Sequence, residues 1–247
     1  MSSRALLLFG LLLALAGQEA AAGVTAERTR VIFPEGAREV SLLVVNLNKY
    51  PVLTQLWIDD GSLDSTPDKA VAPIMPLPAM FRMEPEERRS LRLLFTGDKL
   101  PSDRESLFWL NIYEVPPKPK APLPPESSRL TLAMRTQMKV FYRPKDLSPR
   151  PEAVNSKLIF SLHQKAGAPV LRAENPGPYY VTLSHVELQK AGSIQPIAGT
   201  MLAPFSENDL PIDAPVPDIQ GKFAQGDVAY SWVDDNGISQ ESHAKLH

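Results

Sequence analysis

Histidine is the residue type whose spacing in this chain could most readily support chemistry. The chain has four histidines, and two of them, His243 and His247, have the i, i+4 spacing that can bind zinc on one face of a helix. The surrounding sequence HAKLH lacks the glutamate of the zinc-protease motif and lies at the C-terminus. We therefore interpret this segment as a frayed tail and expect no metal site.

Sequence motifs for nucleophilic or nucleotide chemistry are absent. The sequence has no cysteine, no GxSxG elbow, no Walker loop and no GxGxxG segment. Its formal net charge is -2, which predicts no basic face for a nucleic acid. These features favour a protein that binds a partner stoichiometrically, with no catalytic residue, cofactor or nucleic acid.

The N-terminus has the pattern of a secretory signal peptide. A short segment with one positive charge, Met1 to Arg4, precedes an apolar run from Ala5 to Ala16, and small residues follow. An Ala-x-Ala site ending at Ala22 predicts cleavage before Gly23 and export to the periplasm. The alternative is a membrane anchor, but the apolar run has about 12 residues, short of the roughly 20 needed to cross a bilayer.

The rest of the chain consists of short β-branched or apolar runs separated by Pro, Gly, Asp and Asn. This spacing is typical of a β-sandwich, and 25 prolines in 247 residues indicate many turns. About 225 residues follow the leader of residues 1–22, which suits two immunoglobulin-like domains of roughly 100 residues each. We expect these domains to span residues 23–145 and 146–247, with a proline-rich hinge near residues 143–147.

Twelve runs are expected to form strands. In the first domain they are residues 29–33, 40–47, 52–58, 79–83, 90–95, 107–115 and 130–142. In the second domain they are residues 158–162, 170–173, 179–188, 200–203 and 228–233. Residues 116–128 contain six prolines in 13 residues and are interpreted as an extended loop. Residues 204–217 are interpreted as loop-like.

The last expected strand of the first domain, RLTLAMRTQMKVFY, carries an apolar stripe. Leu130, Leu132 and Met134 share one face, and polar or small residues alternate with them. One interpretation is that this face packs on the core of its own domain, which the pattern alone favours. The other is that a strand following a long loop is an open edge, which pairs with another chain while its side chains fill that chain's groove.

Five sequence blocks resemble the periplasmic pilus-assembly chaperones, the PapD-like family of the chaperone-usher pathway. The longest block is LPSDRESLFWLNIYEVPP at residues 100–117. The others are ERTRVIF at 27–33, TQMKVFYRP at 136–144, ENPGPYYVT at 174–182 and MLAPFS at 201–206. The resemblance covers the whole chain after the leader, and implies an all-β fold of two immunoglobulin-like β-sandwich domains arranged as an L.

The resemblance also implies roles for individual residues. Leu130, Leu132 and Met134 match the donor strand that completes a fimbrial subunit, which is called donor-strand complementation. Arg30 and Lys139 match two cations that bind the subunit's C-terminal carboxylate, whereas outside these motifs they would be ordinary solvated cations. Strict alternation places Lys139 on the face opposite to the donor residues, so we expect a bulge or twist between them.

A third set of matches concerns the contact between the domains. Glu105, Arg143 and Asp235 match the family's interdomain ion cluster, which would fix the angle of the cleft, and the adjacent Asp234 is an alternative to Asp235. The implied partners are fimbrial subunits and an outer-membrane usher. Self-association of the free protein through its open edge is a further expectation. The lack of a cysteine pair favours the short-loop class of the family.

The main alternative is an exported immunoglobulin-like adhesin or a pilus subunit. A subunit carries an N-terminal extension of alternating apolar residues. The corresponding segment here, GVTAERTR at residues 23–30, is too polar for that role. We therefore favour the chaperone hypothesis over both alternatives.

Overall fold

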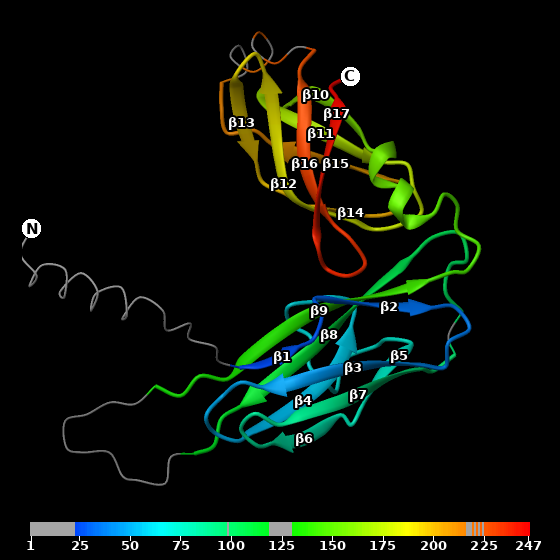
Figure 1. Ribbon diagram of the computed structural model, residues 1–247, viewed down its shortest axis with the longest axis vertical. Helices are drawn as coiled ribbons and strands as arrows, with labels where there is room; N and C mark the ends of the chain where they lie inside the picture. The colour runs from blue at the N-terminus through cyan, green and yellow to red at the C-terminus, as the bar shows by residue number, and fades with distance from the viewer. Residues whose placement is uncertain are drawn as a thin grey trace, which may run out of the picture.

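The computed structural model describes residues 23–97, 99–118, 130–215, 219, 221, 223 and 225–247. Within them the chain forms two β-sandwiches, each with its own hydrophobic core, and Figure 1 shows the two meeting as the arms of an L. The predicted all-β fold of two immunoglobulin-like domains is confirmed. The predicted leader, including Ala22, and most of the predicted proline-rich loop lie outside the described residues.

Two sheets form the first domain. One has the strand order β1, β3, β7, β5 (Val24–Ala26, Glu39–Asn46, Arg88–Phe95 and Ile74–Leu77). The other has the order β2, β9, β8, β4, β6 (Arg30–Pro34, Met134–Arg143, Ser106–Val115, Val52–Asp59 and Met80–Met83). The seven predicted strands of this domain are present with shifted ends. The predictions omitted β1 and β5, which have only three and four residues and are too short to show a period-two pattern.

Alternation along the strands produces the first core. In β3, Leu42 and Val44 point inward and are almost fully buried, while the residues beside them remain partly exposed. Phe33 of β2 and Val140 of β9 contribute fully buried side chains to the same cluster. Each large side chain buried in this way contributes about 1.5–3 kcal/mol, so this core holds β2 and β9 in position.

The second domain contains more strands than the sequence indicated. Its first sheet has the order β10, β11, β15 (Ile159–Lys165, Ala168–Asn175 and Ser206–Pro211). Its second has the order β13, β12, β16, β17, with β14 beside β12 (Ser193–Ile197, Val181–Lys190, Asp227–Val233, Ser239–Lys245 and Met201–Leu202). Two short 3-10 helices, Pro151–Ala153 and Asn155–Lys157, follow the interdomain connection.

Two sequence interpretations of this domain are wrong. Residues 204–217 are not all loop, because β15 pairs with β11 over six residues. The C-terminal segment is not a frayed tail, because β17 pairs with β16 over seven residues and the His247 amide donates to the Phe160 carbonyl at 2.9 Å. Both strands are rich in polar residues, since they lie at sheet edges with a solvated face.

The start of β9 also differs from the prediction. The strand begins at Met134, not at Leu130, because its partner β8 ends at Val115 and the last pair between them is Glu114 with Met134. Residues 130–133 therefore extend beyond the sandwich with no ladder partner among the described residues.

The first two strands of the chain, β1 and β2, follow each other closely but belong to different sheets. β1 pairs with β3 in one sheet, and after a three-residue break β2 pairs with β9 in the other. β2 covers the edge of β9 only from Lys139 to Arg143. Within the described residues, the same edge from Met134 to Met138, termed the free edge below, has no neighbouring strand. No helix in the described part of the chain is long and apolar enough to span a membrane.

Candidate functional site

Arg30 and Lys139 lie side by side where the two domains meet. They are directly paired residues of the parallel strands β2 and β9. The Arg30 guanidinium donates from Nη1 to the Val233 carbonyl at 3.0 Å, and Lys139 Nζ donates to the Thr182 hydroxyl at 3.3 Å. Because Val233 and Thr182 belong to the second domain, both domains shape this cationic pair.

The cationic pair has no carboxylate within 4.0 Å among the described residues. Burial lowers the pKa of Lys139, and the neighbouring charge of Arg30 lowers it further. Burial also lowers the pKa of Arg30, although the charges of Asp235, Asp234 and Glu105 oppose this effect. The Arg30 Nε atom is buried and has no hydrogen-bond partner in the described structure. Two partly desolvated cations with spare donors form a site suited to an anion.

Aromatic rings surround the cationic pair. The Arg30 guanidinium lies 5.9 Å from the centre of the Phe141 ring, and Lys139 Nζ lies 5.7 Å from that of Trp109. Phe141 in turn contacts Tyr180 of the second domain, with ring centres 5.6 Å apart. These rings pack beside the two cations, which have no carboxylate within ion-pair distance in the described part of the chain.

Glu105, Arg143 and Asp235 lie together across the domain junction. Arg143 Nε donates to Glu105 at 2.7 Å, and its two terminal nitrogens donate to Asp235 at 2.5 and 2.7 Å. Glu105 is only 3% exposed and also accepts the Tyr180 amide at 2.8 Å. Burial raises the pKa of Glu105 despite the charge of Arg143. Burial lowers the pKa of Arg143, but the hydrogen bonds to Asp235 and Glu105 and their negative charges outweigh burial and raise the pKa above its ordinary value.

The hairpin between β16 and β17 brings Asp235 to this cluster, and Figure 1 shows it reaching down to the first domain. The alternative residue, Asp234, instead accepts the amides of Asn236 and Ile238 and shapes its own turn. Gly237 has φ +82°, and a β-carbon there would lie 2.3 Å from the Thr29 hydroxyl of the first domain. The junction therefore requires a glycine at the tip of this hairpin.

The residues predicted to form the donor strand are exposed. Leu130, Leu132 and Met134 are 81%, 64% and 46% exposed. They have the same parity as the buried residues Met138 and Val140 of β9, so the apolar stripe continues past the end of its own core. Neither single interpretation of the stripe holds along its whole length, because its later half packs on the core and its first half, Leu130 to Met134, is largely exposed.

The expected bulge or twist between the donor residues and Lys139 is not a bulge within β9, and residues 130–133 lie outside the ladder. β9 pairs with β8 in continuous register from Met134 to Tyr142. Lys139 therefore does lie on the face opposite to Met134, and this outer face is the one that meets the second domain. Residues on the two faces of this regular strand thus have different surroundings, the domain's own core on one side and the second domain on the other.

Arg135 attaches the start of β9 to a neighbouring loop. Its guanidinium donates to Asn111 Oδ1 at 2.7 Å and to the carbonyls of Leu63 and Ser62 at 3.0 and 3.3 Å. It also stacks over Trp57, 5.1 Å from the ring centre. The free edge is consequently held straight from its outer face, without a strand beside it.

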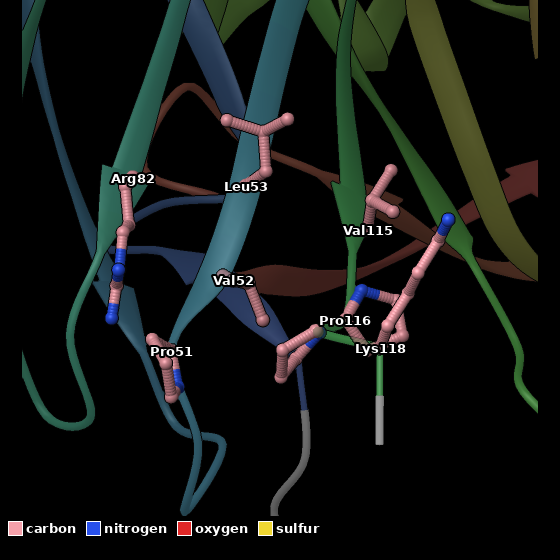
Figure 2. Close-up of a pocket in the computed structure, with 8 residues that line it drawn as sticks. Pro51, Val52, Leu53, Arg82, Val115, Pro116 and Lys118 are labelled. Carbon is pink, nitrogen blue, oxygen red and sulfur yellow. The ribbon is translucent and has the colours of Figure 1, made fainter. Parts of the chain in front are cut away.

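A groove of about 680 Å³ lies at the end of the first domain farthest from the second. Figure 2 shows Leu53 and Val115 on its wall and Pro116 and Lys118 at its lower end, with Arg82 on the opposite side. Leu53 and Val115 are 44% and 37% exposed. Apart from Arg82 and Lys118 its lining residues are valine, leucine and proline, so the groove suits apolar side chains. Among all described residues, no group of three or more His, Cys, Asp or Glu residues could hold a metal ion.

Two immunoglobulin-like β-sandwiches, each with its own core, are the fold class that this chain shares with the pilus chaperones. The chain belongs to the PapD-like family of pili assembly chaperones. The N-terminal domain of that family, described as "Pili and flagellar-assembly chaperone, PapD N-terminal domain", matches residues 23–148. "Pili assembly chaperone PapD, C-terminal domain" matches residues 153–244. The family resemblance found in the sequence is confirmed.

Individual relatives agree with this assignment. The probable fimbrial chaperone YadV of Escherichia coli K12 is 34% identical over 226 residues, which cover 91% of this chain and 90% of the relative. The chaperone protein FimB/FhaD of Bordetella pertussis is 39% identical over 188 residues and 74% of each chain. The crystal structure of the Pseudomonas aeruginosa CupB2 chaperone has 34% identity and a TM-score of 0.75, covering 90% of this chain and all of that one.

A further solved structure includes a partner. The Salmonella enterica SafB chaperone, solved in complex with the SafA pilin, is 28% identical with a TM-score of 0.73 and covers 93% of this chain and 99% of that one. The fold and the family are thus shared with a chaperone that binds a pilin.

Proposed function

We propose that this protein is a periplasmic chaperone that binds fimbrial subunits through β9 and delivers them to an outer-membrane usher. The observation that carries the proposal is the free edge of β9, which leads directly to two cations without a counter-ion. An uncovered strand edge promotes aggregation unless pairing is its task. A cationic pair at its end gives that pairing a fixed position.

Arg30 and Lys139 are proposed to bind the C-terminal carboxylate of the subunit. A carboxylate can accept a hydrogen bond from each cation and replace the mutual repulsion with two attractive contacts. The direction of the added strand follows from this. Its C-terminus lies at Lys139 and its body covers the free edge from Met138 toward Met134, so it runs parallel to β9.

Leu130, Leu132 and Met134 are proposed to complete the core of the subunit. Their side chains are exposed, Met134 at the start of β9 and Leu130 and Leu132 in the segment before it, beyond the end of β8. The fixed carboxylate sets the register, and a slip by one residue would turn each donor side chain to the wrong face. Burying three such side chains contributes roughly 1.5–3 kcal/mol each, so capture needs no nucleotide, cofactor or catalytic residue.

The cluster of Glu105, Arg143 and Asp235 is proposed to hold the cleft at a fixed angle. Ionic groups of this kind contribute more to the specificity of an arrangement than to its stability. We further propose the domain division at residues 23–145 and 146–247, removal of the leader near Ala22 on export, and self-association of the free protein through its open edge.

The test is periplasmic co-expression of the tagged protein with the fimbrial subunit encoded beside its gene, followed by pull-down. The parent protein should retain the subunit. Lys139→Ala should lose it, because the carboxylate site is incomplete. Leu132→Glu should also lose it, because a charge enters the subunit core, while the melting temperature of the free chaperone stays within a few degrees.

Leu63→Glu is the matched control, since Leu63 is 83% exposed and lies off the donor segment. It should capture the subunit as the parent does. Equal capture by all four proteins would refute strand donation and return the exported adhesin or pilus subunit to consideration. A collapse of the Leu132→Glu fold would show that Leu132 belongs to the protein's own core.

A further inference from the structure

Glu114 is a buried carboxylate that the proposed capture of subunits does not use. It lies near the end of β8 on the core-facing side and is 6% exposed. Its Oε2 atom accepts the Val24 amide at 2.6 Å and the Asn48 side-chain amide at 3.4 Å. Among the described residues, no Lys, Arg or His side chain lies within 4.0 Å of it. A buried carboxylate normally has a cationic partner, because desolvation is costly without one.

Gly23 lies beside Glu114, and its nitrogen could supply the missing cation. Its nitrogen donates to Asn48 Oδ1 at 3.1 Å, and its carbonyl accepts the Leu47 amide at 2.9 Å. A β-carbon added to Gly23 would lie 3.4 Å from Glu114 Oε1 and 3.8 Å from Oε2. Gly23 is buried and has φ +104°, so its backbone is held against the carboxylate. As a peptide nitrogen it has one proton, which Asn48 already accepts.

The sequence independently predicts cleavage at the bond before Gly23, through the small residues at Ala20 and Ala22. Hydrolysis of that bond by a signal peptidase consumes one water molecule. It leaves a carboxylate on Ala22 and an amine on Gly23, which is protonated at neutral pH. The new ammonium has three protons where the peptide had one.

We propose that this α-ammonium group binds Glu114 and Asn48, so that processing creates a buried ion pair of the mature fold. The inference rests on the export and cleavage part of the proposed function, and goes beyond it by assigning the new N-terminus a binding site. One proton is donated to Asn48 Oδ1 as before, and a second is directed to Glu114 Oε1. Glu114 Oε2 keeps its bond from Val24.

The ion pair has a consequence for the donor strand. Glu114 is paired with Met134, the first residue of β9, and a β-carbon on Gly23 would lie 3.6 Å from the Met134 Cε atom. The charged N-terminus thus fixes β1 in its sheet and supports the point at which the donor segment leaves the domain. Removal of the leader would thus affect how firmly the start of β9 is held, through Glu114 and Met134.

The experiment is a double-variant cycle in thermal unfolding, made without any subunit. The processed protein, whose mass must correspond to a start at Gly23, is compared with a form that carries a Ser-Gly-Ser-Gly extension before Gly23. Glu114→Gln is introduced into both. In the processed form it should lower the melting temperature by on the order of 10 °C, because a buried ammonium loses its carboxylate. In the extended form it should leave the melting temperature unchanged or raise it.

Glu105→Gln is the control, because Glu105 is equally buried in the same domain but pairs with Arg143. Its effect should be the same in both forms, since distant sites are additive. Equal effects of Glu114→Gln in the two forms would overturn the proposal and leave Glu114 as an acceptor for Val24 alone. A mature mass that starts elsewhere would overturn it too. Neither outcome depends on subunit capture, so the proposed chaperone function is tested separately.

Discussion

Replacement of Lys139 by methionine should have opposite effects on the free protein and on its complex. Methionine keeps an apolar stem against Trp109, and removes the charge together with its weak hydrogen bond to Thr182. Lys139 and Arg30 are paired across adjacent strands, and the charge of Arg30 lowers the pKa of Lys139; their charges are taken to be about 7 Å apart, somewhat more than the strand spacing of about 4.8 Å. At an effective dielectric constant of about 20, two charges at that separation repel by roughly 2 kcal/mol.

The free variant should therefore be as stable as the parent or up to about 2 kcal/mol more stable, which raises the melting temperature by up to about 6 °C. The complex should lose affinity instead. Removing one partner of a partly buried charge pair costs about 2 kcal/mol or more, which corresponds to about 30-fold in Kd. One substitution thus separates the repulsion in the empty cleft from the attraction in the filled one.

The assay is titration with a synthetic peptide equal to the last strand of a fimbrial subunit, made once with a free carboxylate and once with a C-terminal amide. The parent should prefer the free acid by about 30-fold. Lys139→Met should show most of its loss with the free acid and little with the amide. An equal loss with both peptides would refute the carboxylate site, and a large fall in the melting temperature would refute the account of repulsion.

The remaining predictions concern the junction and the second domain. Gly237→Ala should weaken the interdomain contact, because its β-carbon meets Thr29 and its φ is positive; small-angle scattering should show a wider range of domain orientations while each domain stays folded. Arg143→Met should lower stability by about 3–5 kcal/mol, since it leaves Glu105 buried without its cation, and a second change of Glu105→Gln should restore part of this in calorimetry. The pKa of Asp209 is held at about 2, below its ordinary value of 3.8, mainly by hydrogen bonds from the neighbouring arginine and lysine. Because this pKa is lowered in the folded state, ionised Asp209 contributes to stability fully above pH 4, and the contribution is lost as the pH falls toward 2. Asp209→Asn should therefore reduce the loss of stability between pH 4 and pH 2. An unchanged loss over that range would contradict this assignment.

The sequence predicted the strands that are densest in apolar residues. β3, β4 and β8 each carry a run of apolar side chains between turn residues, and core-facing members of these runs, such as Leu42 and Leu110, are buried. The strands β15 and β17 escaped prediction because they have few residues to bury and are held mainly by main-chain pairing. Periodicity reports the burial of side chains, and it says little about a ladder with a polar face.

The candidate site was partly accessible from sequence. The family motifs identified Arg30, Lys139 and the residues of the ion cluster, and the structure brings each set together. Motifs could not give the contribution of Thr182 or the attachment by Arg135, because both depend on which loop lies beside which strand. The expected bulge was wrong because it assumed that donor and anchor share a face. Glu114 had one signal in the sequence, an acidic residue at an inward position of a strand.

The break between β1 and β2 gives the free edge a fixed end. Arg30 of β2 already pairs with Lys139, so a strand added beside Met134 to Met138 meets an occupied position at its C-terminus and cannot slide past it. The last residue of an added strand therefore sets the register of the whole strand along this edge. A subunit that carries extra residues after its natural C-terminus, such as a purification tag, would not fit, whereas additions at its N-terminus would be tolerated.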